Sequence, residues 1–183
     1  MELILILGPM KSGKSFDLIS YFAPLKYTGI PHTLFQSSRN VRDAHIWSRN
    51  GLELSANKVG SLSHIDPDKY KIVGIDEIHM FSESDVTWID KLLRNGVRVV
   101  VSGLDLDYRG QMFPVIKRLF ELGPTEVRYR RAVCEVCRTP DARYTQVLHH
   151  KAALLDGAPA CLPDDGTYEY VPVCRACFVK KTS

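Results

Sequence analysis

The chain has 183 residues, an apolar fraction of 45% and a net charge of +3, which suits one folded core with a small appendage. Such a mild charge does not fit a protein that coats a nucleic-acid polymer, and no apolar run approaches the ~20 residues that span a bilayer membrane. Because the start Met1-Glu2-Leu3-Ile4 lacks the basic region of a signal peptide, we expect a soluble cytoplasmic protein.

The first predicted elements are a buried strand over residues 3–7 and a helix over residues 15–27. The strand is an uninterrupted apolar run, and the helix has apolar residues at helical spacing until Gly29 and Pro31 end it. Between them, Gly8–Ser15 matches the pattern G-x-x-x-x-G-K-[ST]. A glycine loop between a strand and a helix is the context in which this pattern binds phosphate.

This loop is therefore predicted to hold the phosphates of a nucleoside triphosphate. Glycines allow backbone N–H groups to surround phosphate oxygens, and the start of a helix adds unpaired donors. Lys14 would neutralise the β- and γ-phosphates, and the Ser15 hydroxyl would bind Mg²⁺. The other members of the predicted nucleotide-binding set are Gly8, Pro9, Met10, Lys11, Ser12 and Gly13. The alternative is a chance glycine turn without a ligand.

Further along the chain, strands and helices alternate. We predict strands over 33–35, 71–75 and 97–101, and helices that carry the apolar residues of 86–93 and 115–120. The polar stretch 36–68 has no pattern that predicts an element. The alternation predicts an α/β protein with a parallel sheet and helices on both faces.

An acidic pair, Asp76-Glu77, follows the predicted strand over 71–75. A carboxylate at the end of a buried strand beside a phosphate loop can hold Mg²⁺, so Asp76 is the predicted metal-side acid. Glu77 would then face the group that attacks the γ-phosphate, which is water in an ATPase and a substrate hydroxyl in a kinase. The alternative for this pair is a solvated turn.

The next strand ends in two carboxylates, an arginine and aromatic side chains. The segment is Val101–Gly110, and Phe113 follows three residues later. Ligands bind at the carboxyl ends of parallel strands, so this segment is predicted to reach the same site. Periodicity alone favours core positions for Leu104 and Phe113, and Tyr108 and Arg109 could be exposed.

The five cysteines all lie in the last third of the chain. Four of them form two Cys-x-x-Cys pairs, Cys134/Cys137 and Cys174/Cys177, whereas Cys161 is predicted to be an ordinary loop thiol. In a reducing cytosol, the two pairs favour a tetrahedral Zn²⁺ site over disulfides or a redox function. Four thiolates leave no position open for water, so the zinc is predicted to be structural and not catalytic.

In chain order, these motifs resemble those of the type II thymidine kinases over nearly the whole sequence. The matching segments are Gly8–Ser15, Gly74–Glu77, Gly103–Gly110, the two cysteine pairs and Tyr170. The resemblance implies a RecA-like P-loop core over residues 1–130 and a small zinc-stapled lasso over residues 131–183 that closes over the nucleoside. It also implies a homotetramer that transfers the ATP γ-phosphoryl group to the 5′-hydroxyl of thymidine, with deoxyuridine as a further candidate acceptor.

The same resemblance implies roles for individual residues. Glu77 would be the base near the 5′-hydroxyl, and Lys14 and Arg109 would stabilise phosphoryl charge. The residues that would bind the nucleoside are Met10, Leu104, Tyr108, Phe113, Thr145, Asp165, Gly166, Thr167 and Tyr170. Lys11 and His79 depart from the family pattern, which usually has an aromatic residue and a glutamine at these positions.

Two other functions stay open at this point. One is a nucleic-acid-stimulated ATPase whose zinc ribbon binds DNA, which predicts a basic face and strongly salt-dependent binding. The other is a regulatory nucleotide-binding protein without turnover. The mild charge and the segment Gly103–Gly110 argue against the first, and the presence of Lys14, Ser15, Asp76 and Glu77 argues against the second.

Overall fold

The computed structural model of the chain describes residues 2–40, 46–47, 53–163 and 165–180. Its centre is a six-stranded sheet in which every neighbouring pair of strands is parallel. From one edge to the other, the strands are β5 (Asn57–Val59), β2 (His32–Ser37), β6 (Ile72–Asp76), β7 (Arg98–Gly103), β1 (Leu3–Leu7) and β8 (Glu126–Tyr129). The prediction of a parallel α/β sheet is confirmed.

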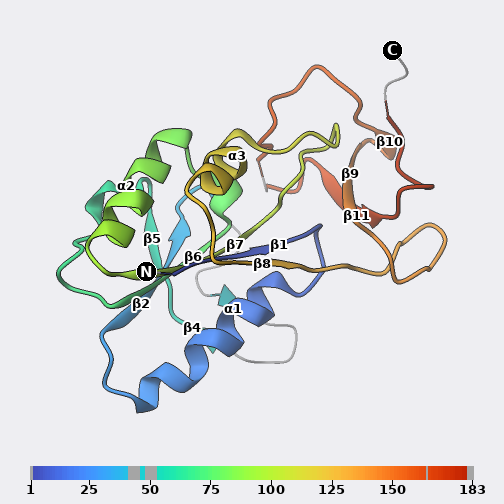
Figure 1. The fold of residues 1–183 in the computed structure, drawn as a ribbon. Coiled ribbons are helices and arrows are strands. Elements are labelled where there is room, and N and C mark those ends of the chain that lie inside the picture. The colour runs from blue at the N-terminus through green and yellow to red at the C-terminus, as the bar shows by residue number, and fades with distance from the viewer. Residues whose placement is uncertain (1, 41–45, 48–52, 164, 181–183) are drawn as a thin grey trace.

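Helices cover both faces of this sheet. Figure 1 shows α1 (Lys14–Phe22) below the sheet, and α2 (Glu83–Arg94) and α3 (Pro114–Glu121) above it. Successive side chains of a strand point to opposite faces, so Leu5 packs in the core beneath α2 and α3, whereas Ile6 packs against α1. Burial on both faces explains why β1 is an uninterrupted apolar run.

The first helix is shorter than predicted. The α-helix ends at Phe22 and continues as a 3₁₀ turn over Ala23–Tyr27, so the prediction of a helix over 15–27 is wrong in its last part. The cause is Pro24, which has no N–H to donate and whose ring crowds the carbonyl group of the preceding turn. The 3₁₀ turn leads into the loop before β2.

The stretch 36–68, for which no element was predicted, contains several short ones. Besides β5, these are the antiparallel pair β3 (Ile46–Trp47) and β4 (Glu53–Leu54), and a 3₁₀ turn over Leu62–His64. Residues 41–45 and 48–52 of this stretch lie outside the described residues. The edge strand β8 was also missed, because the sequence Glu-Val-Arg-Tyr has only a short and mostly polar pattern.

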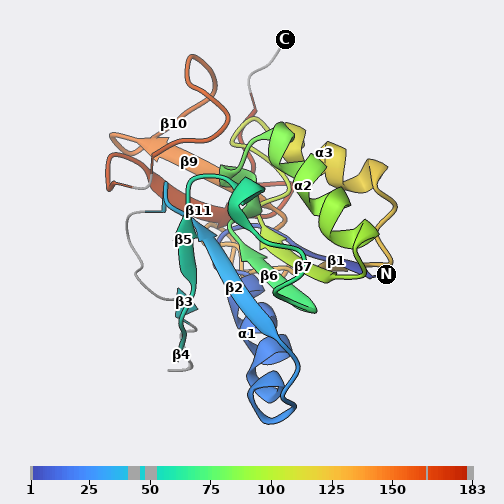
Figure 2. The same ribbon diagram turned by 90° about the vertical axis from the view of Figure 1, so that its left-hand side faces the viewer.

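A second, antiparallel sheet follows the large one in the chain. Its strands are β10 (Ala152–Ala153), β9 (Tyr144–His149) and β11 (Glu169–Val173), in that order. Figures 1 and 2 show β9 and β11 beyond the large sheet, on the side where β1 ends. No helix in the described ranges is long and apolar enough to span a membrane. The predicted boundary at residue 130 stays a prediction.

Candidate active site

The loop over residues 8–15 connects β1 to α1 at the carboxyl edge of the large sheet. Gly8 and Gly13 have φ angles of 149° and 81°, which a residue with a side chain rarely adopts. A side-chain carbon on Gly8 would also lie 2.4 Å from the carbonyl oxygen of Arg130, so only glycine fits there. The predicted context of strand, glycine loop and helix is therefore present.

Lys14 is buried at the start of α1, and its Nζ donates a hydrogen bond to the carbonyl oxygen of Pro9 at 2.7 Å. Burial lowers the pKa of Lys14. The carboxylates of Glu77, Asp76 and Asp105 act in the opposite direction. An ammonium group that folds back onto its own loop can exchange a carbonyl partner for phosphate oxygens, which form stronger, charge-assisted hydrogen bonds.

Asp76 is buried at the end of β6 and accepts hydrogen bonds from two hydroxyl groups. One comes from Ser102 of β7, and the other comes from Ser15 at 3.3 Å. Burial raises the pKa of Asp76, and the hydrogen bond from Ser102 opposes that rise. Neighbouring oxygens around octahedral Mg²⁺ are ~3 Å apart for bonds of about 2.0–2.1 Å. The oxygens of Ser15 and Asp76 therefore fit a shared magnesium ion.

A pocket opens beside the loop. Six of the predicted nucleoside-binding residues line it together with Glu77: Met10, Leu104, Tyr108, Phe113, Thr145 and Tyr170. Met10 is also part of the phosphate loop. The pocket and the loop therefore share a wall, so a ligand in the pocket lies next to the predicted phosphate site.

Glu77 follows β6 in a left-handed backbone conformation, with φ 53° and ψ 44°. This conformation costs free energy in a residue with a side chain, and such residues cluster at functional sites. It begins the 3₁₀ turn Ile78–Met80, which directs the Glu77 side chain into the wall of the pocket. Oε2 of Glu77 lies 3.4 Å from Nδ1 of His79.

His79, which the sequence did not assign to the site, also lines the pocket. Burial, aided by the positive charge of Lys14, lowers the pKa of His79 to about 3, so its ring is neutral. Nδ1 accepts a hydrogen bond from the Leu104 N–H at 3.2 Å, which places the ring proton on Nε2. His79 is therefore unsuited to accept a proton near neutral pH and forms no ion pair with Glu77. The Glu77 carboxylate can act as that proton acceptor.

The C-terminal part of the chain contacts the phosphate loop at two points. Oγ1 of Thr145, on β9, accepts a hydrogen bond from the N–H of Met10 at 3.0 Å. Nζ of Lys11 forms an ion pair at 2.6 Å with Oε1 of Glu135, a residue that lies in sequence between the two cysteines of the first pair. The first contact joins the small sheet to the loop and the second joins the first cysteine pair to it, although 124 or more residues separate the partners in sequence.

One wall of the pocket was missed by the sequence analysis. Ala160, Cys161 and Leu162 line the pocket, and burial raises the pKa of the Cys161 thiol, which was expected in an ordinary loop. Two tyrosine hydroxyls hold this segment: Tyr108 donates to the carbonyl oxygen of Ala158 at 2.7 Å, and Tyr170 donates to that of Pro163 at 3.2 Å. The short apolar run 158–162 was the available signal in the sequence.

Arg109 and the turn 165–167 are not among the described residues that line this pocket. The Arg109 guanidinium donates two hydrogen bonds to Asp107 Oδ2, from Nε at 2.9 Å and from Nη2 at 2.7 Å. Asp165, Gly166 and Thr167 form an exposed turn in which the Thr167 N–H donates to Asp165 Oδ1 at 2.9 Å. Their contacts with a substrate stay predictions.

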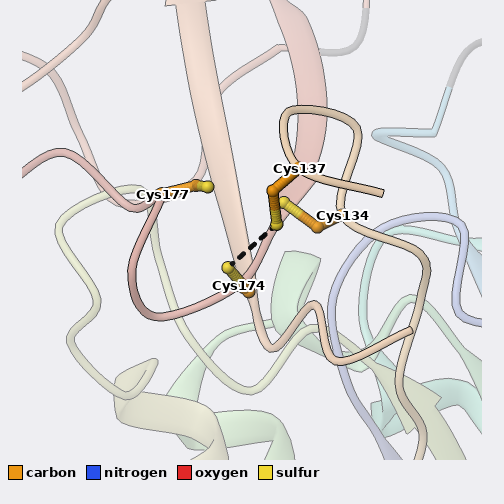
Figure 3. Close-up of side chains that lie close together, drawn as sticks. All are labelled: Cys134, Cys137, Cys174 and Cys177. Atoms are coloured by element: carbon orange, nitrogen blue, oxygen red, sulfur yellow. Dashed lines mark hydrogen bonds between the residues drawn. The ribbon is translucent and has the colours of Figure 1, made fainter. Parts of the chain in front are cut away.

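The four paired cysteines meet in one cluster, which Figure 3 shows. Their sulfur atoms all lie within 4.8 Å of one another, and the Sγ atoms of Cys137 and Cys174 are 3.6 Å apart. All five described cysteines are free thiols. Sulfurs bound to one tetrahedral zinc ion at about 2.3 Å are ~3.8 Å apart, whereas a disulfide bond is about 2.05 Å long. The cluster therefore fits a zinc ion and not a pair of disulfides.

The thiols of this cluster differ in their ease of ionisation. Burial opposes ionisation of Cys134, but hydrogen bonds from backbone N–H groups outweigh it and lower the pKa of this thiol to about 6. Hydrogen bonds with Cys137 and Cys174 raise the pKa of Cys177 to about 12. Four thiolates so close together repel one another, and a divalent cation would relieve that repulsion.

Comparisons with known proteins agree with this arrangement. A family model described as thymidine kinase matches residues 1–178. A protein of Mycoplasma mobile, named thymidine kinase, is 29% identical over 180 residues, which are 96% of this chain and 86% of the relative. Another of that name, from Mesomycoplasma hyopneumoniae strain 7448, is 32% identical over 178 residues, which are 94% of this chain and 92% of the relative.

Proposed function

The chain belongs to the thymidine kinase family, and from this premise we propose that it phosphorylates the 5′-hydroxyl of thymidine, or of deoxyuridine, with ATP as the donor. The observation that carries the proposal is the wall that the pocket shares with the phosphate loop, at Met10. A nucleoside in this pocket would have its sugar next to Glu77 and its 5′-oxygen within reach of a γ-phosphate held by the loop. Holding both reactants in this way removes much of the entropy cost of their encounter.

The proposed reaction is an in-line transfer. The 5′-oxygen forms a bond to the γ-phosphorus, and the bond from that phosphorus to the bridging oxygen of ADP breaks. Glu77 orients the hydroxyl and takes its proton late in this step, and Lys14 neutralises charge on the phosphates. We further propose that Arg109 leaves Asp107 to contact the phosphoryl group, and that residues 165–167 close over the base.

The side chains that would hold magnesium are Ser15 and Asp76, whose oxygens lie 3.3 Å apart. When bound, Mg²⁺ would neutralise charge on the β- and γ-phosphates. Ser102 fixes one oxygen of Asp76 by its hydrogen bond, which orients the other oxygen toward Ser15. The remaining contribution of the protein is to position the reactants and to exclude water from the pocket.

A coupled kinase assay with a panel of nucleosides tests this function. ADP release is expected to depend on thymidine or deoxyuridine and to be nearly absent with purine nucleosides or with no nucleoside. ATP hydrolysis at the same rate with and without a pyrimidine nucleoside would contradict a kinase. Hydrolysis that increases with single-stranded or duplex DNA would favour the nucleic-acid-stimulated ATPase, which the family does not support.

We also propose that Cys134, Cys137, Cys174 and Cys177 bind one structural zinc ion. Metal analysis of the protein purified without chelators is expected to give one zinc per chain. The double variant Cys174→Ser/Cys177→Ser is expected to lose this zinc and to unfold at a lower temperature, because the metal joins two segments that are distant in sequence. Cys161→Ser is the matched control and is expected to keep full zinc content. A wild-type protein with no zinc would contradict the site.

The family also leads us to propose a cytoplasmic homotetramer. In the proposed arrangement, residues 1–130 bind the donor nucleotide, and residues 131–183 form a cover for the nucleoside. Two contacts support this arrangement, because they connect the donor loop directly to the cover. They are the ion pair of Lys11 with Glu135 and the hydrogen bond from Met10 to Thr145.

A further inference from the structure

Arg130 lies against the phosphate loop, one residue beyond the end of β8. Its N–H donates a hydrogen bond to the carbonyl oxygen of Leu7 at 2.7 Å, which extends the pairing of β8 with β1 up to the loop. Its carbonyl oxygen occupies the space that a side chain on Gly8 would need. The backbone of Arg130 is therefore fixed relative to the loop at two points.

The side chain of Arg130 reaches the start of α1. Nη2 lies 3.8 Å from the position that a side-chain carbon on Gly13 would occupy, and Nη1 lies 3.5 Å from Asp17 Oδ2. The first turn of a helix has unpaired N–H groups and a partial positive charge, which together attract phosphate. The Arg130 guanidinium adds a full positive charge beside the same helix start.

We infer that Arg130 is a binding residue for the phosphate chain of the donor nucleotide. The inference rests on the proposed function, in which the loop holds ATP. A guanidinium group matches the geometry of phosphate oxygens and can form two parallel hydrogen bonds with them. Because 43% of the Arg130 side chain is exposed, phosphate can reach it from solvent.

The contact of Arg130 with Asp17 leaves room for such an exchange. At 3.5 Å it is longer than the 2.7–2.9 Å or so of a charge-assisted hydrogen bond, so phosphate oxygens would offer closer partners. Asp17 itself places a negative charge in the first turn of α1, where it repels phosphate. Neutralising Arg130 and neutralising Asp17 should therefore change nucleotide affinity in opposite directions.

Arg128 provides a matched control. It lies two residues earlier on β8, so its side chain is on the same face of the strand, and Asp17 also acts on its charge. Its backbone pairs with Ile6 inside β1, before the loop, and its side chain forms an ion pair with Glu126 at 2.7 Å. Arg128→Gln removes one positive charge, as Arg130→Gln does, but it leaves the guanidinium group beside the loop in place.

The test is the dissociation constant of Mg-ATP, measured by calorimetry without a nucleoside so that no turnover occurs. We expect Arg130→Gln to raise this constant about 5- to 10-fold, as for a partly exposed charged contact, and Asp17→Asn to lower it about 2-fold. Arg128→Gln is expected to stay within about 2-fold of wild type, and Arg130→Lys to fall between wild type and Arg130→Gln. The effect of Arg130→Gln should shrink at high salt.

Three results would overturn the inference. The first is wild-type affinity for ATP in Arg130→Gln, and the second is an equal loss in Arg128→Gln, which would indicate a general charge effect. The third is an equal loss of affinity for adenosine, which has no phosphate. Thermal unfolding at the wild-type temperature shows that each variant is folded. A wild-type enzyme that fails to phosphorylate thymidine would contradict the proposed function. The comparison of ATP dissociation constants would still show whether Arg130 binds the phosphates.

Discussion

Lys14→Ala is expected to lower thymidine phosphorylation by about 100- to 1,000-fold at saturating substrates, because charge-neutralising groups aimed at the transition state have effects of this size. Lys14 is buried at the start of α1, and its Nζ is held by the Pro9 carbonyl, ready to turn to phosphate oxygens. Alanine cannot replace that charge, and water cannot easily do so in a buried position. The measurement is the turnover number in the coupled assay, together with the KM for ATP.

Lys117→Ala is the control for this prediction, because Lys117 is an exposed lysine on α3. It is expected to keep wild-type turnover. The Lys14→Ala protein should still bind thymidine, since Lys14 does not line the nucleoside pocket described above. A Lys14→Ala variant with turnover close to that of wild type would show that this lysine does not stabilise the reacting phosphate.

Glu77→Gln is expected to lower turnover by about 100- to 1,000-fold, the size typical for loss of a general base. Glutamine keeps the shape of the side chain and can still accept a hydrogen bond from the nucleoside, but its neutral amide does not take up the hydroxyl proton. His79 cannot compensate, because burial first and the charge of Lys14 second hold its pKa at about 3. The KM for ATP and for thymidine should each change by less than about 5-fold, since the affected group acts in the transition state.

Glu83→Gln is the matched control, since Glu83 is an exposed acid six residues further along the chain, in the first turn of α2. It should behave as wild type. If Glu77→Gln instead lost ATP affinity while the turnover of bound substrate persisted, Glu77 would hold the metal ion or the phosphates and would not be the base. Both kinetic constants must therefore be measured for each variant.

The fold could be predicted from the sequence where local patterns are strong, and the prediction failed where they are weak. The apolar run of β1 and the glycine loop after it lie where the sequence predicts them, because burial on both faces of a sheet leaves a continuous hydrophobic signal. The helix α1 was predicted to be too long, because the apolar spacing in the sequence continues past Pro24. The edge strand β8 and the strands of the small sheet were not predicted. These strands are short and partly polar, and they pair with segments that lie elsewhere in the sequence.

The candidate site shows the same division. Glu77 could be named from a local motif, and Leu104 and Thr145 from the family resemblance; all three line one pocket. The wall formed by Ala160 and Cys161 could not be named, because its place depends on tyrosine hydroxyls that lie elsewhere in the chain.

The sequence by itself determined the local patterns: a glycine loop between a strand and a helix, an acidic pair at a strand end and four cysteines in two pairs, each typical of a particular kind of ligand. Only the tertiary structure decided which of these groups meet. The hydrogen bond from Ser15 to Asp76, the contact of Thr145 with the loop and the approach of Arg130 to α1 all join residues far apart in the chain. Their distances depend on the packing of whole strands and helices, which no short window of sequence contains.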